Sequence, residues 1–251
     1  MITSIANSIW LRIKPAKDRF SRLLGATIIC ICMLHPGIGC AEGLLYQLPK
    51  DGSWVRFNIQ YTFKSEGVEQ SGQQILTMAS VGKTIEGVEP CRWIEFKIQA
   101  NENGTERLWI RKLLIPERYL KKGENPTLHV VRGWTMQEDG KVERAVPVHG
   151  RWPAFLAGPL QDETKLAKQL VESKLGQLMC EGAAGWIQFA EGNLNTIVTF
   201  ESRLHEKAPF GVVATRMLFE VRGDGSNYTI DSTAKLTDLG EGAKSALTGY
   251  K

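Results

Sequence analysis

The feature that most constrains the fold is a run of strict alternation beginning at Val55. From Val55 to Lys64 every second residue is apolar or aromatic, and the residues between them are polar. A period of two places the two sets on opposite faces of an extended strand. The run therefore predicts a half-buried β-strand with one dry face and one wet face.

Shorter runs of the same kind recur along the chain and are divided by turn-prone residues. Short spacers join antiparallel neighbours, because a parallel pair needs a long crossover. The predicted strands are 74–81, 92–99, 107–113, 127–136, 142–148, 186–190, 194–204, 212–222 and 227–238, and the predicted turns include 81–83 and 138–141.

One segment departs from this period. Between Asp162 and Met179, Leu166, Leu170 and further apolar residues recur at helical spacing opposite a charged face, and Asp162 can cap the start. The segment predicts an amphipathic helix. The predicted fold class is therefore mainly β (α+β): a curved antiparallel meander sheet or half-barrel of about nine or ten strands, with one helix packed on its concave face.

The first 41 residues have the composition of a secretory leader. A basic segment reaching Arg22 precedes an apolar run of twelve residues, and small residues end at Ala41. Twelve helical residues span about 18 Å, less than the roughly 30 Å hydrocarbon core of a bilayer. We expect a signal peptide over 1–41 and a single β-rich, non-spanning domain over 42–251, in the periplasm or outside the cell. An uncut leader acting as an anchor and a lipidated Cys40 remain open alternatives.

The charge of the domain argues against nucleic acid as a partner. Of 31 Lys and Arg residues and 27 Asp and Glu residues, five and one lie in the leader, which leaves 26 of each. A neutral domain lacks the basic surface that binds a phosphate backbone.

No spacing in the sequence indicates a metal, a cofactor or a catalytic cluster. His129, His149 and His205 are far apart, and no phosphate loop or dinucleotide fingerprint is present. We therefore expect no metal and no cofactor, and the sequence favours a non-enzymatic protein. Of the five cysteines only Cys91 and Cys180 lie outside the leader. They form either a disulfide or two separate buried thiols.

The tryptophans suggest an apolar ligand site. Six of the seven lie after the leader, and a curved sheet that carries aromatic groups under an amphipathic helix is a common form of hydrophobic pocket. The alternative is that these side chains complete a core. The candidate ligand-binding residues are Trp93, Trp109 and Trp134 of the sheet with Leu166 and Leu170 of the helix.

The order of predicted elements from 42 to 251 resembles the periplasmic lipoprotein-localisation carriers. In these proteins an unclosed antiparallel barrel, covered by helices, holds acyl chains. The stretches 44–54 and 238–245 are also similar to exported bacterial proteins with no assigned function. No signature motif carries either resemblance, so neither transfers a residue role.

Three hypotheses follow from the sequence. The first is an exported envelope protein that binds a lipid, an acyl chain or another apolar ligand between sheet and helix. The second is a structural or protein-interaction module of the envelope without a small ligand. The third is a secreted hydrolase whose site is assembled only in three dimensions.

Overall fold

The structure, a computed structural model, describes residues 46–102, 105–121, 124–144, 160–191, 193–223 and 226–250. These residues form one eleven-stranded antiparallel sheet with two short 3₁₀ helices. The strands are β1 (Trp54–Ser65), β2 (Val68–Glu86), β3 (Glu89–Glu102), β4 (Thr105–Pro116), β5 (Arg132–Met136), β6 (Val142–Arg144), β7 (Gln161–Ser173), β8 (Gly176–Glu191), β9 (Leu194–Leu204), β10 (Val212–Gly223) and β11 (Ser226–Gly240); the 3₁₀ helices are η1 (Glu117–Tyr119) and η2 (Pro126–His129).

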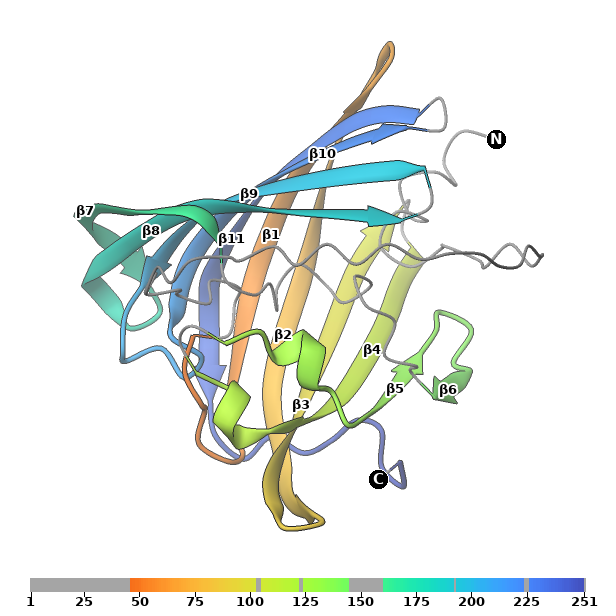
Figure 1. The fold of residues 1–251 in the computed structure, drawn as a ribbon, viewed down its shortest axis with the longest axis vertical. Helices are drawn as coiled ribbons and strands as arrows, with labels where there is room; N and C mark the ends of the chain where they lie inside the picture. The colour runs from red at the N-terminus through yellow and green to blue at the C-terminus, as the bar shows by residue number, and fades with distance from the viewer. Residues whose placement is uncertain are drawn as a thin grey trace, which may run out of the picture. The chain divides into compact units, whose positions relative to one another are not determined.

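The sheet consists of two meanders joined along one seam. Its order is β6-β5-β4-β3-β2-β1-β11-β10-β9-β8-β7, so β1 and β11 are the only neighbours that are not consecutive in sequence. Within the described residues β6 and β7 are edge strands and the sheet is not closed. The sheet curves (Figure 1), and β7 contacts β10 and β11, which are three and four positions away in the sheet order.

The predicted antiparallel pairing of consecutive strands is confirmed, but the predicted amphipathic helix is wrong. Asp162–Met179 forms most of β7, a hairpin turn, and the start of β8. Gly176, at φ +88°, follows the turn, and its backbone conformation favours glycine. The segment adds strand β7 and extends the predicted strand 186–190 back to Gly176, so the sheet has eleven strands.

Strand β7 has the protective features of an edge strand. Its residues are mostly exposed, and Lys165, Lys168 and Glu172 place charges along it. Its register against β8 shifts twice, between Gln161 and Thr164 and between Leu166 and Gln169. Charges and bulges discourage pairing with another chain. The bulges also interrupt the strand alternation, and helix-forming Lys, Leu and Glu residues then imitate a helical pattern.

Two other local predictions differ from the structure. Val81–Lys83 is an irregularity inside the β2–β3 pairing, and the hairpin turn lies further on, at Gly87 with φ +64°. Part of the predicted strand 127–136 is η2 instead. The predicted turn at 138–141 is confirmed: Gly140, at φ +78°, donates its N–H to the Gln137 carbonyl.

The two ends of the sheet differ. Only hairpins, such as β1–β2 and β5–β6, join the described strands at one end, whereas the other end has the longer β4–β5 and β9–β10 connections beside the β2–β3 and β7–β8 hairpins. At that second end the Tyr46 N–H donates to the Phe210 carbonyl at 2.7 Å. Leu120, Ala208 and Phe210 of these connections are fully buried. The β2–β3 hairpin extends beyond its neighbours at this end (Figure 1).

The expected leader, residues 1–41, lies outside the described residues. Within the part of the chain that the structure describes, no helix has the length and apolar character needed to cross a bilayer.

Candidate ligand-binding face

One side of the sheet is a continuous apolar surface, here called the apolar face. Residues that pair directly across antiparallel strands share a face. Phe57 pairs with both Leu76 and Leu236, so the apolar set crosses the β1–β11 seam without interruption. Its buried members on seven strands include Val55, Phe57, Ile59, Leu76, Met78, Ile94, Phe96, Trp109, Leu113, Val198, Phe200, Met217, Phe219, Ile230 and Leu236.

Trp109 is the only one of the three candidate tryptophans on this face. It pairs with Ile98 of β3 and is 6% exposed. Leu113, four residues along β4, is fully buried on the same side. An aromatic ring with polar indole N–H beside aliphatic side chains suits contact with a hydrocarbon chain.

Polar side chains interrupt the apolar face at several positions, including the buried residues Gln74, Ser80, Thr196, Ser202, Thr215 and Ser232. Arg111 lies opposite Phe96 and Thr135 in the pairing of β4 with β3 and β5. Its Nε donates to the Thr135 hydroxyl at 3.4 Å. Burial lowers the pKa of Arg111 to about 10, because the charged guanidinium loses solvation. Sequence reasoning missed Arg111, although strand alternation through Trp109 places both residues on one face.

Trp93 and Trp134 lie on the opposite face and do not join Trp109. Trp93 packs with Cys91 and Leu114 in a separate buried cluster, against which Val81 and Trp134 are packed. The alternation of 92–98 predicts this placement, since Trp93 shares a face with Glu95 and Lys97. These two tryptophans therefore belong to a second small core, apart from the apolar face.

The C-terminal tail, residues 241–250, covers that second core. Glu95, 5% exposed, accepts bonds from Ser245 Oγ at 2.7 Å and from the Ala246 N–H at 3.0 Å. Directly opposite on β4, Lys112 donates from Nζ to the carbonyls of Leu247 and Tyr250, at 3.2 and 2.8 Å. Lys112 Nζ also lies 4.9 Å from the Trp93 ring centroid. The tail is thus held by two buried charges of opposite sign.

Leu166 and Leu170 lie on β7, because the helix that was to carry them is absent. Leu170 is 52% exposed and pairs with Met179, which is 55% exposed. Leu166 pairs with Gly182, and the Leu166 side chain occupies the space beside that glycine. Neither residue lies over the apolar face as part of a helical cover.

Cys91 and Cys180 are free and buried thiols. They lie on β3 and β8, and five strands separate these two in the sheet order. Burial raises the pKa of both thiols above the usual value. The structure therefore has the second of the two alternatives, two separate buried thiols, and not a disulfide.

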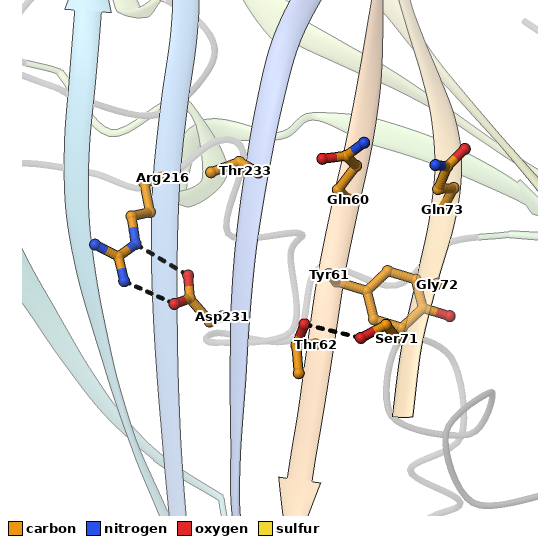
Figure 2. A pocket seen from close by; sticks show the side chains of 9 residues that line it. All are labelled: Gln60, Tyr61, Thr62, Ser71, Gly72, Gln73, Arg216, Asp231 and Thr233. Carbon is orange, nitrogen blue, oxygen red and sulfur yellow. Dashed lines mark hydrogen bonds and ion pairs between the residues drawn. The ribbon is translucent and has the colours of Figure 1, made fainter. Parts of the chain in front are cut away.

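The outward face carries a shallow polar groove of about 540 Å³ (Figure 2). Its wall includes Gln60 and Thr62 of β1 with Ser71 and Gln73 of β2, and the hydroxyls of Thr62 and Ser71 lie 3.1 Å apart. At its other side Arg216 binds both carboxylate oxygens of Asp231, at 3.0 and 2.7 Å. The two charges neutralise one another, so this groove has the character of solvated surface.

The chain is similar to several solved structures, while no protein-family model and no curated protein matches it. A candidate lipoprotein from Parabacteroides distasonis is 7% identical, with a TM-score of 0.38, over 79% of this chain and 100% of its own. A candidate exported protein with a YmcC-like fold from Bacteroides fragilis is 8% identical, with a TM-score of 0.35, over 80% and 100%. A candidate outer-membrane lipoprotein-sorting domain from Vibrio parahaemolyticus is 10% identical, with a TM-score of 0.20, over 79% and 86%. All three TM-scores are below 0.5.

Among the residues that the structure describes, no group of three or more His, Cys, Asp or Glu side chains could hold a metal ion. His129 instead stacks on Tyr119, with ring centroids 3.4 Å apart. The buried ion pair of Arg92 with Glu117 also serves structure, since Arg92 donates to the Pro49 carbonyl at 2.7 Å and to Ser80 Oγ at 3.0 Å. The apolar face is the best candidate for a binding site.

Proposed function

We propose that this chain is an exported envelope protein that binds a lipid or another hydrophobic ligand on the apolar face, without catalysing a reaction. The observation that carries the proposal is the continuity of that face across the β1–β11 seam. Phe57, Phe96 and Phe200, from β1, β3 and β9, all belong to it. Within the described residues the sheet is not closed, so its two edges can move apart to admit a ligand.

The energy of such binding comes from hydrocarbon burial. Each methylene group removed from water contributes roughly 0.8 kcal/mol. The entropy lost when a flexible ligand and a few protein side chains become ordered opposes this gain. Only a long acyl chain therefore has a clearly favourable net free energy of binding. The size of the apolar face favours a ligand of this class over a small aromatic one.

Export to the envelope rests on the leader-like residues 1–41. We propose that the mature domain, 42–251, works in the periplasm or outside the cell. A lipid carried through an aqueous compartment must be shielded from water. The apolar face supplies that shield.

The first test is native mass spectrometry of the mature protein purified from its own envelope, followed by organic extraction. We expect a discrete added mass that extracts as lipid. A mass equal to that of the bare chain, and no uptake of a fluorescent long-chain fatty acid by the same protein, would refute the proposal. That result would favour an envelope interaction module.

A pair of variants locates the site. Ala100 lies on the apolar face and is 4% exposed, so Ala100→Trp fills space that the ligand would occupy. We expect it to weaken fatty-acid binding at least roughly tenfold, because the indole ring takes the place of a hydrocarbon chain lying along this face. Ala190→Trp adds the same ring at an exposed position of β8 and should bind like the wild type. Circular dichroism of both variants checks folding, and equal binding by the two would place the ligand elsewhere.

A further inference from the structure

The tip of the β2–β3 hairpin carries the two most exposed large apolar side chains of the described residues. Val88 is 98% exposed and Ile85 is 72% exposed. Leu128 of η2, in a connection at the same end of the sheet, is 54% exposed. Single exposed apolar residues are common on protein surfaces, but apolar residues that gather at one place indicate a contact with a partner.

The hairpin tip stands clear of the sheet. The pairing of β2 with β1 ends at Ala79, and the pairing of β3 with β4 begins at Cys91, so the residues between them pair only with one another. The hairpin therefore projects beyond its neighbours (Figure 1). Gly87, at φ +64°, and Val88 form its turn. Hairpin turns favour Gly, Asn, Asp and Ser, so the turn itself does not explain a valine.

Two arginines brace the projecting hairpin. Glu86 and Glu89 lie directly opposite each other beside the turn, and like charges in such a pair are unfavourable. Arg132 of β5 forms an ion pair with Glu86, and Arg118 of η1 lies 2.9 Å from Glu89. Each carboxylate of the tip is therefore balanced by a cation from another element, and both ion pairs support the hairpin in its projecting position.

The shape and charge of the tip suit a lipid bilayer better than a protein. A stable protein interface buries about 800 Å² on each partner, which a narrow tip with two aliphatic side chains does not provide. A bilayer needs no matching shape, because apolar side chains enter the boundary between head groups and acyl chains. Lys83 is exposed two residues before Ile85 on the same side of β2. Its amine can reach a lipid phosphate while its aliphatic stem lies beside the apolar tip.

We propose that the protein docks on a lipid bilayer through the tip of the β2–β3 hairpin, with the Ile85 and Val88 side chains inserted below the head groups. The inference rests on the proposed function in one respect: a bilayer is the source or the destination of the lipid that the apolar face binds. Docking through this tip turns one end of the sheet toward the membrane.

The first test is flotation of the mature protein with vesicles of equimolar phosphatidylcholine and phosphatidylglycerol. We expect the wild type to float with the vesicles. The double variant Ile85→Ser, Val88→Ser should bind at least roughly tenfold more weakly, because two aliphatic side chains no longer leave water on binding. Ile75→Ser is the matched control, since Ile75 lies on the outward face of the same strand and is 40% exposed. It should bind like the wild type.

A label at the tip tests insertion directly. Cys91 and Cys180 are 1% and 0% exposed, so a thiol-reactive, polarity-sensitive dye should react selectively with an added cysteine at an exposed position. We expect the emission of the dye on Val88→Cys to shift to the blue when vesicles are added. The same dye on Ile75→Cys should not shift.

The outcomes separate this proposal from the proposed function, because fatty-acid binding is measured on the same proteins in solution. The double variant should bind a fluorescent fatty acid like the wild type. Fatty-acid binding without flotation, flotation that the double variant retains in full, or an unchanged emission at Val88→Cys overturns docking through the tip and leaves the apolar face as a lipid site. Flotation through the tip without any fatty-acid binding refutes the proposed function and not the docking.

Discussion

At the scale of single residues, the exposed pair of Arg216 and Asp231 gives a measurable dependence of stability on pH. Hydrogen bonding to Arg216 lowers the pKa of Asp231 below its usual value. A carboxyl group whose pKa is lower in the folded protein stabilises it above the pKa of the unfolded chain, and this contribution is lost as the pH falls through the lowered value. We expect Asp231→Asn to lower the melting temperature slightly at neutral pH and not at all in strong acid.

The effect must be small, because both side chains are well exposed and solvent screens them. Thr233→Ala, on the same strand and the same groove wall, is the matched control. It should change the melting temperature equally at every pH. A pH-independent difference between wild type and Asp231→Asn would contradict the ion-pair explanation.

Single residues also show what the sequence could predict about the site. The alternation in 107–113 places Arg107, Trp109 and Arg111 on one face, so the candidate site could have included both arginines. The candidate residues were chosen for apolar and aromatic character alone, so both arginines were omitted. The alternation assigns Trp93 to its face, but the cover of Trp93 and Trp134 by the C-terminal tail could not be predicted, because it depends on contacts between residues far apart in sequence, such as Glu95 with Ser245.

At the scale of elements, the error in 162–179 has a physical cause. Helical spacing of leucines and helix-forming Lys, Glu and Gln residues favour a helix locally. Pairing of β8 with β9 along most of its length outweighs that preference. That pairing involves the next strand along the chain, which a helical pattern within 162–179 does not take into account. The glycine at 176, which supports the turn, was the local signal that could have indicated a hairpin.

The C-terminal tail is the element whose attachment depends most clearly on one residue. Glu95→Gln removes the charge that accepts bonds from Ser245 and Ala246 and leaves Lys112 buried opposite a neutral amide. Hydrogen bonds to charged groups contribute about 1.5–3 kcal/mol each, so we expect a loss of stability of about that size. Urea denaturation measures the loss, and a shift in tryptophan emission reports exposure of Trp93.

Lys97→Gln is the control for this prediction, because Lys97 follows on the same strand and the same face. We expect it to change stability by about 0.5 kcal/mol or less, as is usual for a substitution away from such contacts. If the two variants lose the same stability, Glu95 does not anchor the tail.

At the scale of the whole domain, the β1–β11 seam joins two meanders that the sequence predicts separately. Short spacers predict neighbouring strands within β1 to β6 and within β9 to β11. No local pattern predicts that the first strand pairs with the last, since residues such as Phe57 and Leu236 are far apart in sequence. The register follows once both strands present an apolar side, because a shift of one residue would turn that side to water.

The seam predicts that the two meanders assemble even without a covalent connection. Coexpressed fragments 42–144 and 160–251 should copurify, because β1 pairs with β11 along its whole length, Tyr46 bonds Phe210, and the C-terminal tail bonds Glu95 and Lys112 of the other fragment. A tag on one fragment and native mass spectrometry of the eluate measure the association. Ile59→Asp places a charge at a 3% exposed position of the seam and should abolish copurification. If the unmodified fragments elute separately, the seam is too weak to unite the sheet, and the connection between β6 and β7 must hold the domain together.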